Sequence, residues 1–396
     1  MKINVISIII CLFTLDMYAQ TICADHELDY CYKQVTKALE TMEPYNYNME
    51  PRNIFNGQTT WNCREASAKE WCSGFWPGIL WMTYETHNDK KILNAAKGYT
   101  KSIFNIINQP IYDHDLGFLI INSILKGYEQ TNCNKYKKIA LLAADSLATL
   151  YNPKVGTILS WPRHITDYGG HNTIMDNMIN LELLFWASEN GGNKMLKNIA
   201  INHATTTMQH HFRPDGSAFH VAIYDTITGK FIKAQTHQGY ADYSMWARGQ
   251  AWAIYGYTMV YRYTHDKVFL DFAEKVTDIY LKRLTENSTD LIPIWDFDDP
   301  RKNMAPKDAS AACIVASALL ELQKYTTTKK AKIYKQSAED MLLSLSSEKY
   351  QSRQNNVGFL MHSTGHHPAN SEIDATIIYA DYYYIEALTR LKKLQQ

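Results

Sequence analysis

The sequence has no excess of charge of either sign. Its 396 residues include 40 lysines and arginines and 40 aspartates and glutamates, for a formal net charge of +0. A neutral chain has no overall field that would attract nucleic acid or an anionic membrane surface. We therefore expect neither as a partner, and an anionic ligand must be held by local groups.

Metal and cofactor signatures are also missing. The seven cysteines form no C-x-x-C pair, which argues against zinc or thioredoxin-like chemistry. His210-His211 and His366-His367 lack H-E-x-x-H or carboxylate spacing, so we interpret them as surface or loop histidines. The sequence contains no nucleophile elbow, Walker loop or dinucleotide fingerprint. It thus predicts no metal and no cofactor.

A long apolar run occurs only at the N-terminus. Residues 3–15 follow Lys2, are too short to form a stable membrane anchor, and are followed by the small residue Ala19. This pattern is typical of a secretory signal peptide over residues 1–19, with a periplasmic or secreted mature chain. Lipidation of Cys23 is a weaker alternative.

An oxidising compartment would permit disulfides in the mature chain. Cys63 and Cys72 could form one, although a core of this size does not require it. We expect buried free thiols instead.

Aromatic residues are abundant, with 27 tyrosines and 9 tryptophans. Such an excess fits either a large core or a cleft whose ring faces stack on sugars, and composition alone does not choose between them.

An apolar helix, a short polar turn and a more amphipathic helix recur along the chain. The pairs are predicted at 74–81 with 92–107, 116–128 with 139–150, 176–188 with 195–210, 246–263 with 269–284, 309–324 with 331–345, and 375–394 with 28–42. Six hairpins with buried inner helices predict an all-α fold, a single (α/α)6 barrel over residues 20–396. An open solenoid is the alternative, which the uneven repeat spacing disfavours. The only strand signal, residues 219–224 before Gly229, predicts a small β-hairpin in a connecting loop.

Polar and aromatic residues gather in the connections that precede the inner helices. These connections are 112–115, 160–163, 175–177, 235–248, 295–298, 308 and 372–374. Every inner helix of such a barrel starts at the same end, so the segments should converge on one mouth. Helix N-capping suffices to explain Asp308 and Asp374. Asp115 and Asp176 lie within denser polar clusters, which favours catalysis.

Several ordered motifs support a family resemblance. They are 71–78 (WCSGFWPG), 113–118 (DHDLGF), 175–178 (MDNM), 212–217 (FRPDGS), 238–240 (QGY), 246–252 (WARGQAW) and 378–384 (IYADYYY). Together they resemble the unsaturated glucuronyl hydrolases, glycoside hydrolase family 88, whose fold is an (α/α)6 barrel. The resemblance implies release of the 4,5-unsaturated uronic acid from the non-reducing end of lyase-generated oligosaccharides. Family members hydrate the vinyl ether double bond rather than attack the anomeric carbon.

The resemblance also implies residue roles. Asp176 matches the family's general acid and base, and Asp115 matches its second essential aspartate. To donate a proton near pH 6, a free Asp of pKa near 3.9 needs a rise of about two units, which burial and a neighbouring carboxylate can supply. We therefore expect the pKa of Asp176 to be raised.

Binding positions follow from the same match. Arg248 and Gln238 would hold the substrate carboxylate and the water. The other matched cleft residues are His114, Trp161, His220, Trp252 and Trp71. Residues 361–372, where the family varies in its treatment of sulfated sugars, contain no lysine or arginine here.

Two other functions fit the barrel: a polysaccharide lyase with a Tyr or His base, and a non-catalytic glycan-binding protein. The sequence leaves open whether chondroitin, hyaluronan, heparin or another polymer is the source, and whether the chain is a monomer or dimer.

Overall fold

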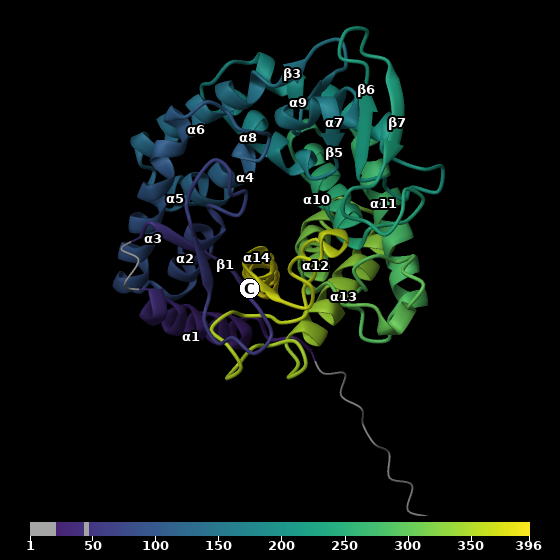
Figure 1. The fold of residues 1–396 in the computed structure, drawn as a ribbon. Helices are drawn as coiled ribbons and strands as arrows, with labels where there is room; N and C mark the ends of the chain where they lie inside the picture. Colours follow the sequence, from purple (N-terminus) through teal and green to yellow (C-terminus); the bar gives the residue numbers. More distant parts are fainter. Residues whose placement is uncertain (1–20, 43–46) are drawn as a thin grey trace, which may run out of the picture.

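The computed structural model describes residues 21–42 and 47–396, so the predicted signal peptide lies outside the described residues. Helices are arranged in two concentric rings (Figure 1). The hairpins are α2 (Phe75–His87) with α3 (Lys90–Ile103), α4 (Leu116–Ile120) and α5 (Lys126–Thr131) with α6 (Asn134–Ala148), α8 (Asn177–Glu189) with α9 (Met195–His210), α10 (Ala247–Thr264) with α11 (Lys267–Asn287), α12 (Ala309–Leu322) with α13 (Thr328–Leu345), and α14 (Ile378–Gln395) with α1 (Ala24–Met42). The predicted six-hairpin barrel is confirmed.

The inner ring is apolar because its helices are covered on all sides. Every residue of α12 is buried, whereas its outer partner α13 buries a single stripe that faces the inner ring. α12 packs on both α10 and α14, and α1 packs on α14 and α2, which closes the ring. This burial of whole helices explains why the inner segments have little polar periodicity in sequence.

One inner helix departs from the prediction. The segment expected as a continuous helix over 116–128 contains a π-helical turn, Ile121–Leu125, between α4 and α5. Gly117 lies directly against α8, where an added Cβ would be 2.3 Å from Asn180 Oδ1. Close approach of α4 to α8 at this point requires the glycine, and π-turns often accompany functional sites.

Short sheets lie in the connections. β6 (Val221–Tyr224) and β7 (Phe231–Gln235) form the predicted hairpin, joined by β5 (His171–Ile174). The sequence did not predict β1 (Met49–Ile54), β2 (Asn62–Glu65) and β8 (Thr376–Ile377), which pair in the order β2-β1-β8, or β3 (Tyr151–Asn152) with β4 (Thr157–Ile158). These strands are two to six residues long and too short to show alternation.

Two further expectations concern the described residues. Cys63 and Cys72 are free rather than bridged, and Cys31, Cys72 and Cys313 are buried thiols, as expected. Among the described helices, none has the length and apolar character needed to cross a membrane.

Candidate active site

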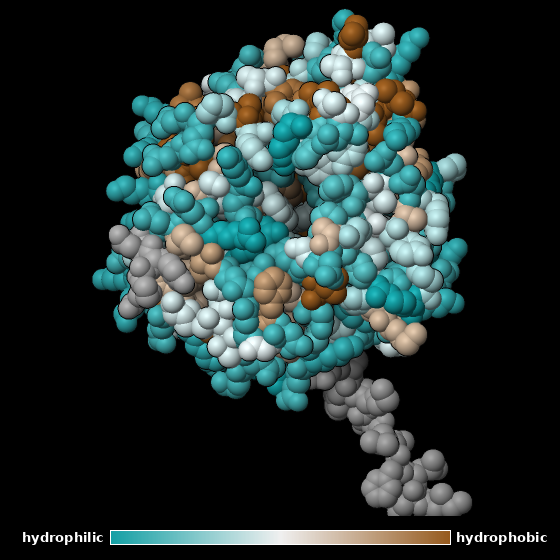
Figure 2. All heavy atoms as spheres, in the orientation of Figure 1, coloured by the Kyte–Doolittle hydropathy of each residue, from teal (hydrophilic) through white to brown (hydrophobic). Residues whose placement is uncertain are grey.

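A cleft of ≈ 330 Å³ opens where the inner helices begin. Figure 2 shows a hollow at the centre of this face, bordered by hydrophilic residues. The lining includes Arg52, Lys69, Trp71, Asp113, Asp115, Trp161, Arg163, Asp176, His237, Gln238, Arg248, His366, Glu372 and Tyr379. The connections before the inner helices therefore converge on one mouth. Residues 295–298 do not line the cleft but brace it, because Asp296 accepts a hydrogen bond from the backbone N–H of Tyr240 (2.8 Å).

Asp115 and Asp176 occupy the residue before α4 and α8, yet neither side chain caps its helix. Asp308, by contrast, accepts a bond from Ser310 N at the start of α12 (3.2 Å), as predicted for a cap. The predicted cap at Asp374 is wrong, because this residue lies in a loop and contacts His362 Nδ1 (2.5 Å). The two cleft aspartates are thus available for chemistry.

A buried histidine lies behind Asp176. His220 Nδ1 accepts a hydrogen bond from the backbone N–H of Gln238 (3.1 Å), so the ring proton resides on Nε2. That Nε2 is 3.5 Å from Asp176 Oδ2, and neither atom has another partner among the described residues. His220 therefore orients the Asp176 carboxylate and favours its ionised form.

Asp115 has a matching arrangement. Asn180 Oδ1 accepts a bond from Phe118 N (2.7 Å), which identifies Asn180 Nδ2 as the donor to His114 Nδ1 (3.1 Å). The proton of His114 is then on Nε2, 3.5 Å from Asp115 Oδ1. Burial lowers the pKa of His114, so the ring is neutral. His114 and His220 lie behind the acids rather than in the lining of the cleft.

The two aspartates differ in protonation, and not as predicted. Burial and the carboxylates of Asp113 and Asp176 raise the pKa of Asp115 well above its usual value. Burial also acts on Asp176, but His220, Arg248 and His114 outweigh it and leave its pKa below the usual value. The expected rise at Asp176 is therefore absent from the free protein, and the raised pKa belongs to Asp115 instead.

Arg248 is nearly inaccessible and firmly held. Its Nη1 donates to Asp308 Oδ2 (2.8 Å) and to the carbonyl of Thr364, and its Nη2 donates to the carbonyl of Gly365. The Nε–H and one Nη2–H have no partner among the described residues, so they can bind an anion in the cleft. Gln238 Nε2 shares the Gly365 carbonyl at 3.4 Å. Both residues line the cleft as expected.

Aromatic side chains form the cleft walls. Trp161 stacks on Tyr168, with ring centroids 5.6 Å apart, and Trp71 lies 4.9 Å from Tyr379. The expected contact of Trp252 with substrate is not supported. Its side chain is fully buried in the core beside Phe118 and outside the cleft lining, because α10 turns this position toward the barrel centre.

Sequence reasoning missed part of the cleft. Arg52 in β1 makes a two-pronged ion pair with Glu372, through Nε–Oε1 (2.7 Å) and Nη2–Oε2 (2.8 Å). Arg163 pairs with Asp113 (2.9 Å). Glu372, Asp113 and Arg163 belong to the polar connections noted in the sequence, whereas nothing local distinguishes Arg52.

The histidine pairs were only partly interpreted correctly. His366 lies in a loop but lines the cleft, 3.3 Å from His237. His211, expected at the surface, is fully buried at the end of α9, where burial lowers its pKa to about 3. Within the described ranges no cluster of His, Cys, Asp and Glu could hold a metal ion.

Comparison with known proteins gives consistent matches. The model of Glycosyl Hydrolase Family 88 matches residues 34–394. The chain is 45% identical to the unsaturated glucuronyl hydrolase of Formosa agariphila over 331 residues, 83% of this chain and 81% of that protein. A crystal structure of an unsaturated glucuronyl hydrolase specific for heparin has a TM-score of 0.86 at 39% identity, covering 94% of this chain and 97% of that one. A variant of the unsaturated glucuronyl hydrolase from Streptococcus agalactiae, complexed with dGlcA-GalNAc6S, has a TM-score of 0.78 at 30% identity, covering 94% and 93%.

Proposed function

The chain belongs to Glycosyl Hydrolase Family 88, and we propose that it hydrates the double bond of a 4,5-unsaturated uronic acid at the non-reducing end of lyase-generated oligosaccharides and thereby releases that sugar. The observation that carries the proposal is a pair of uncapped aspartates, Asp115 and Asp176, whose environments move their pKa values in opposite directions. Two titratable groups of one site whose environments move their pKa values apart are typical of acid–base catalysis. Arg248, beside them, has free donors for the uronate carboxylate.

The proton must reach Asp176 before the reaction. The pKa of Asp176 is low partly because Arg248 is nearby. When the uronate carboxylate binds Arg248, its negative charge offsets that positive charge, so the pKa of Asp176 rises. Substrate binding then favours the protonated form of Asp176, and Asp115, whose raised pKa marks it as an acid in the same cleft, is the source of that proton.

Asp176 next donates this proton to carbon 4 of the sugar. A vinyl ether is protonated at carbon because the positive charge is shared with the ring oxygen. Water adds at carbon 5 and gives its proton to the Asp176 carboxylate, which restores the acid. The resulting hemiketal opens and the glycosidic bond breaks. Gln238 and Arg248 fix the sugar between the acid and the water.

The alternatives have less support. A lyase needs a Tyr or His base, and the cleft offers poor ones. Burial raises the pKa of Tyr379, the tyrosine in the cleft lining, and lowers the pKa of His237 and of His366 to about 4, which makes both histidines weak bases. A glycan-binding protein would not require two largely shielded carboxylates, 14% and 13% exposed, that leave their helix starts uncapped.

Turnover of an unsaturated disaccharide in heavy water tests the reaction. Loss of the ultraviolet absorbance of the double bond and deuterium on carbon 4 of the released uronate are expected. A released sugar that still absorbs and carries no deuterium would indicate attack at the anomeric carbon. If the protein bound the disaccharide but released no product, it would be a glycan-binding protein.

We also propose how the cleft discriminates between sulfated and unsulfated neighbouring sugars. The cleft wall formed by His366, Ala369 and Ser371 includes no lysine or arginine from residues 361–372. We therefore expect a sulfate on the neighbouring sugar to be accepted only where it reaches Lys69 or Arg163, the cations that line the cleft outside this segment. A panel of sulfated and unsulfated unsaturated disaccharides measures this preference as a ratio of kcat/KM.

The location of the protein rests on sequence alone. The apolar residues 3–15 and the small Ala19 support cleavage near Gln20 and export to the periplasm or the medium. N-terminal sequencing of the exported chain, against a form without residues 1–19 retained in the cytoplasm, tests the proposal.

A further inference from the structure

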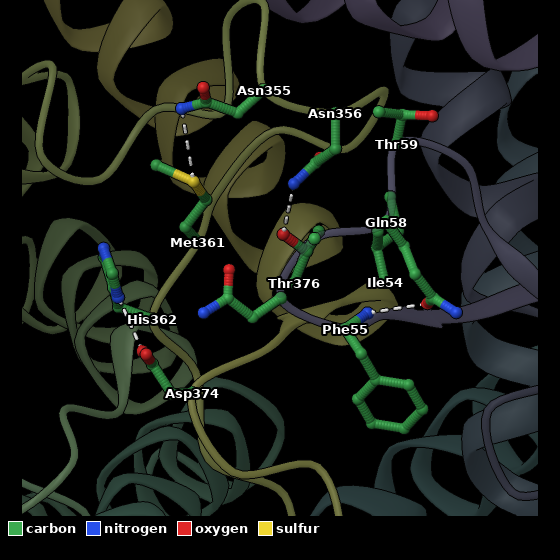
Figure 3. A pocket seen from close by; sticks show the side chains of 12 residues that line it. Ile54, Phe55, Gln58, Thr59, Asn355, Asn356, Met361, His362, Asp374 and Thr376 are labelled. Carbon is green, nitrogen blue, oxygen red and sulfur yellow. Dashed lines mark hydrogen bonds and ion pairs between the residues drawn. The ribbon is translucent and has the colours of Figure 1, made fainter.

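A second pocket, of ≈ 390 Å³, lies beside the catalytic cleft and shares no lining residue with it. Its walls are the β1–β2 turn, residues 54–59, and the facing segments 355–362 and 374–376 (Figure 3). Nothing in the proposed reaction uses this pocket.

The lining has the chemistry of a site for an uncharged sugar. Asn56, Gln58, Asn355 and Asn356 contribute amides, and the ring of Phe55 is 43% exposed. Amides offer both donors and acceptors, as sugar hydroxyls require. An exposed aromatic ring can pack on the C–H face of a pyranose.

The pocket is unsuited to an anion. No lysine or arginine lines it. Its only carboxylate, Asp374, contacts His362 Nδ1 at 2.5 Å and is about half exposed. A sulfate or uronate would meet a negative charge and no lysine or arginine, because the one basic side chain of the lining, His362, already contacts Asp374.

Several of the amides are already held in place. Gln58 Oε1 accepts from Asn62 Nδ2 (2.7 Å), and Asn356 Nδ2 donates to Thr376 Oγ1 (3.1 Å). Among the described residues, Gln58 Nε2 and Asn355 Oδ1 have no hydrogen-bond partner. A donor and an acceptor therefore remain available for a ligand.

The backbone of the pocket is tied together as well. Val357 N donates to the carbonyl of Thr59 (3.0 Å), which joins the two walls. Gln34 Nε2 in α1 donates to the carbonyls of Asn356 (2.9 Å) and Gly358 (2.7 Å). A site with fixed walls loses little conformational entropy when it binds a ligand.

One hairpin borders both the pocket and the cleft. Ser363 and Ala375 exchange backbone hydrogen bonds of 2.8 Å at its base. Gly365 and Glu372 of this hairpin line the cleft, whereas Met361, His362, Asp374 and Thr376 line the pocket. A saccharide that leaves the cleft over this hairpin would reach the pocket.

We propose that the pocket binds a neutral pyranose, a hexose or an N-acetylhexosamine. The chemistry of the lining is independent of the reaction, and only the identification of the sugar as a later unit of the substrate rests on the proposed function.

Saturation-transfer NMR with methyl N-acetyl-β-glucosaminide tests binding directly. This probe has no double bond and is not a substrate, so the result does not depend on turnover. Wild-type protein should show transfer, and the double variant Phe55→Ala/Gln58→Ala should lose at least about fivefold of it. Asn198→Ala, at an exposed position of the outer helix α9, should retain the wild-type signal. Absence of transfer to wild type, or equal transfer to the double variant, would overturn the proposal.

Kinetics then identify the source of the sugar. If the pocket holds a later unit of the substrate, the double variant should lose about tenfold in kcat/KM on an unsaturated tetrasaccharide, which corresponds to 1.4 kcal/mol. Its kcat/KM on the disaccharide should stay within twofold of wild type. If the double variant loses saturation transfer but keeps the wild-type kcat/KM on both substrates, the pocket binds a separate glycan rather than a later unit of the substrate. A disaccharide that is not turned over by wild type would contradict the proposed function and leave the NMR result standing.

Discussion

Arg52→Met removes the ion pair that holds one wall of the cleft, and it should affect both stability and catalysis. The Arg52 and Glu372 side chains are 13% and 6% exposed, so the pair is largely shielded from water. Glu372 also accepts a bond from Asn53 Nδ2 (2.5 Å). Its carbonyl accepts from Gly365 N (2.8 Å), and the Gly365 carbonyl binds Arg248. The wall therefore connects Arg52 to the proposed carboxylate-binding group.

The magnitudes follow from this burial. Removing one partner of a buried pair costs about 3–5 kcal/mol, since the remaining charge is left uncompensated. Glu372→Gln should cost less, about 1–2 kcal/mol, because Arg52 keeps its bond to Glu70 (2.7 Å). The double variant should cost less than the sum of the single variants, with an interaction energy of about 1.5 kcal/mol or more. A shift of the hairpin by about 1 Å should lower kcat/KM by about 100-fold.

Urea unfolding of wild type, the two single variants and the double variant measures the four free energies of this double-mutant cycle. Disaccharide turnover measures kcat/KM. Arg353→Met serves as a control, because its pair with Glu348 is exposed (42% and 87%) and should contribute about 0–1 kcal/mol. The reasoning would be refuted if the destabilisations of the two single variants summed to that of the double variant within about 0.5 kcal/mol. It would also be refuted if folded Arg52→Met kept the wild-type kcat/KM.

The remaining predictions concern the acid pair and the carboxylate site. Asp176→Asn should fold and bind substrate but lose several orders of magnitude in kcat, because a carboxamide cannot relay a proton; near wild-type kcat would place the acid elsewhere. Asp115→Asn should move the alkaline limb of the kcat/KM profile to lower pH, because the proton must then be held by Asp176, whose pKa is low; an unchanged limb would disprove the sharing of one proton. Arg248→Lys should raise KM and lower kcat/KM by a factor equivalent to about 2–4 kcal/mol, since an ammonium cannot supply the planar fork; unchanged kcat/KM would make Arg248 part of the scaffold.

The helical framework was predictable because its signal is local and repeated. Apolar inner segments alternate with amphipathic outer ones, and the turns between them are polar, so six hairpins follow from periodicity. The position of the cleft follows in turn, since all inner helices start at one end. The π-turn at Ile121–Leu125 could not be predicted, because its residues are all buried, like the α-helical turn before it, and leave no periodicity that distinguishes a π-turn from an α-helix.

The missed residues share a different cause. Arg52 is placed by β1, a six-residue strand that pairs with β8 across more than 320 residues of sequence. Neither strand has enough length to be recognised alone, so the pairing and the Arg52–Glu372 contact exist only in the folded chain. His366 reached the cleft by the same hairpin. Long-range pairing of short strands is therefore the part of this site that sequence patterns do not reveal.

The pKa values of Asp115 and Asp176 could not be predicted correctly from the sequence, and their order affects the mechanism. Sequence reasoning assigned the raised pKa to Asp176 because the two effects it anticipated, burial and a neighbouring carboxylate, both raise the pKa of an acid. The structure adds His220, with its Nε2–H toward Asp176, and the guanidinium of Arg248, both of which favour the carboxylate. An acid held ionised until a negatively charged substrate arrives cannot protonate a neutral sugar that enters the same cleft. The uronate carboxylate is therefore needed both for binding to Arg248 and for raising the pKa of Asp176. Its removal from the substrate should lower kcat as well as raise KM.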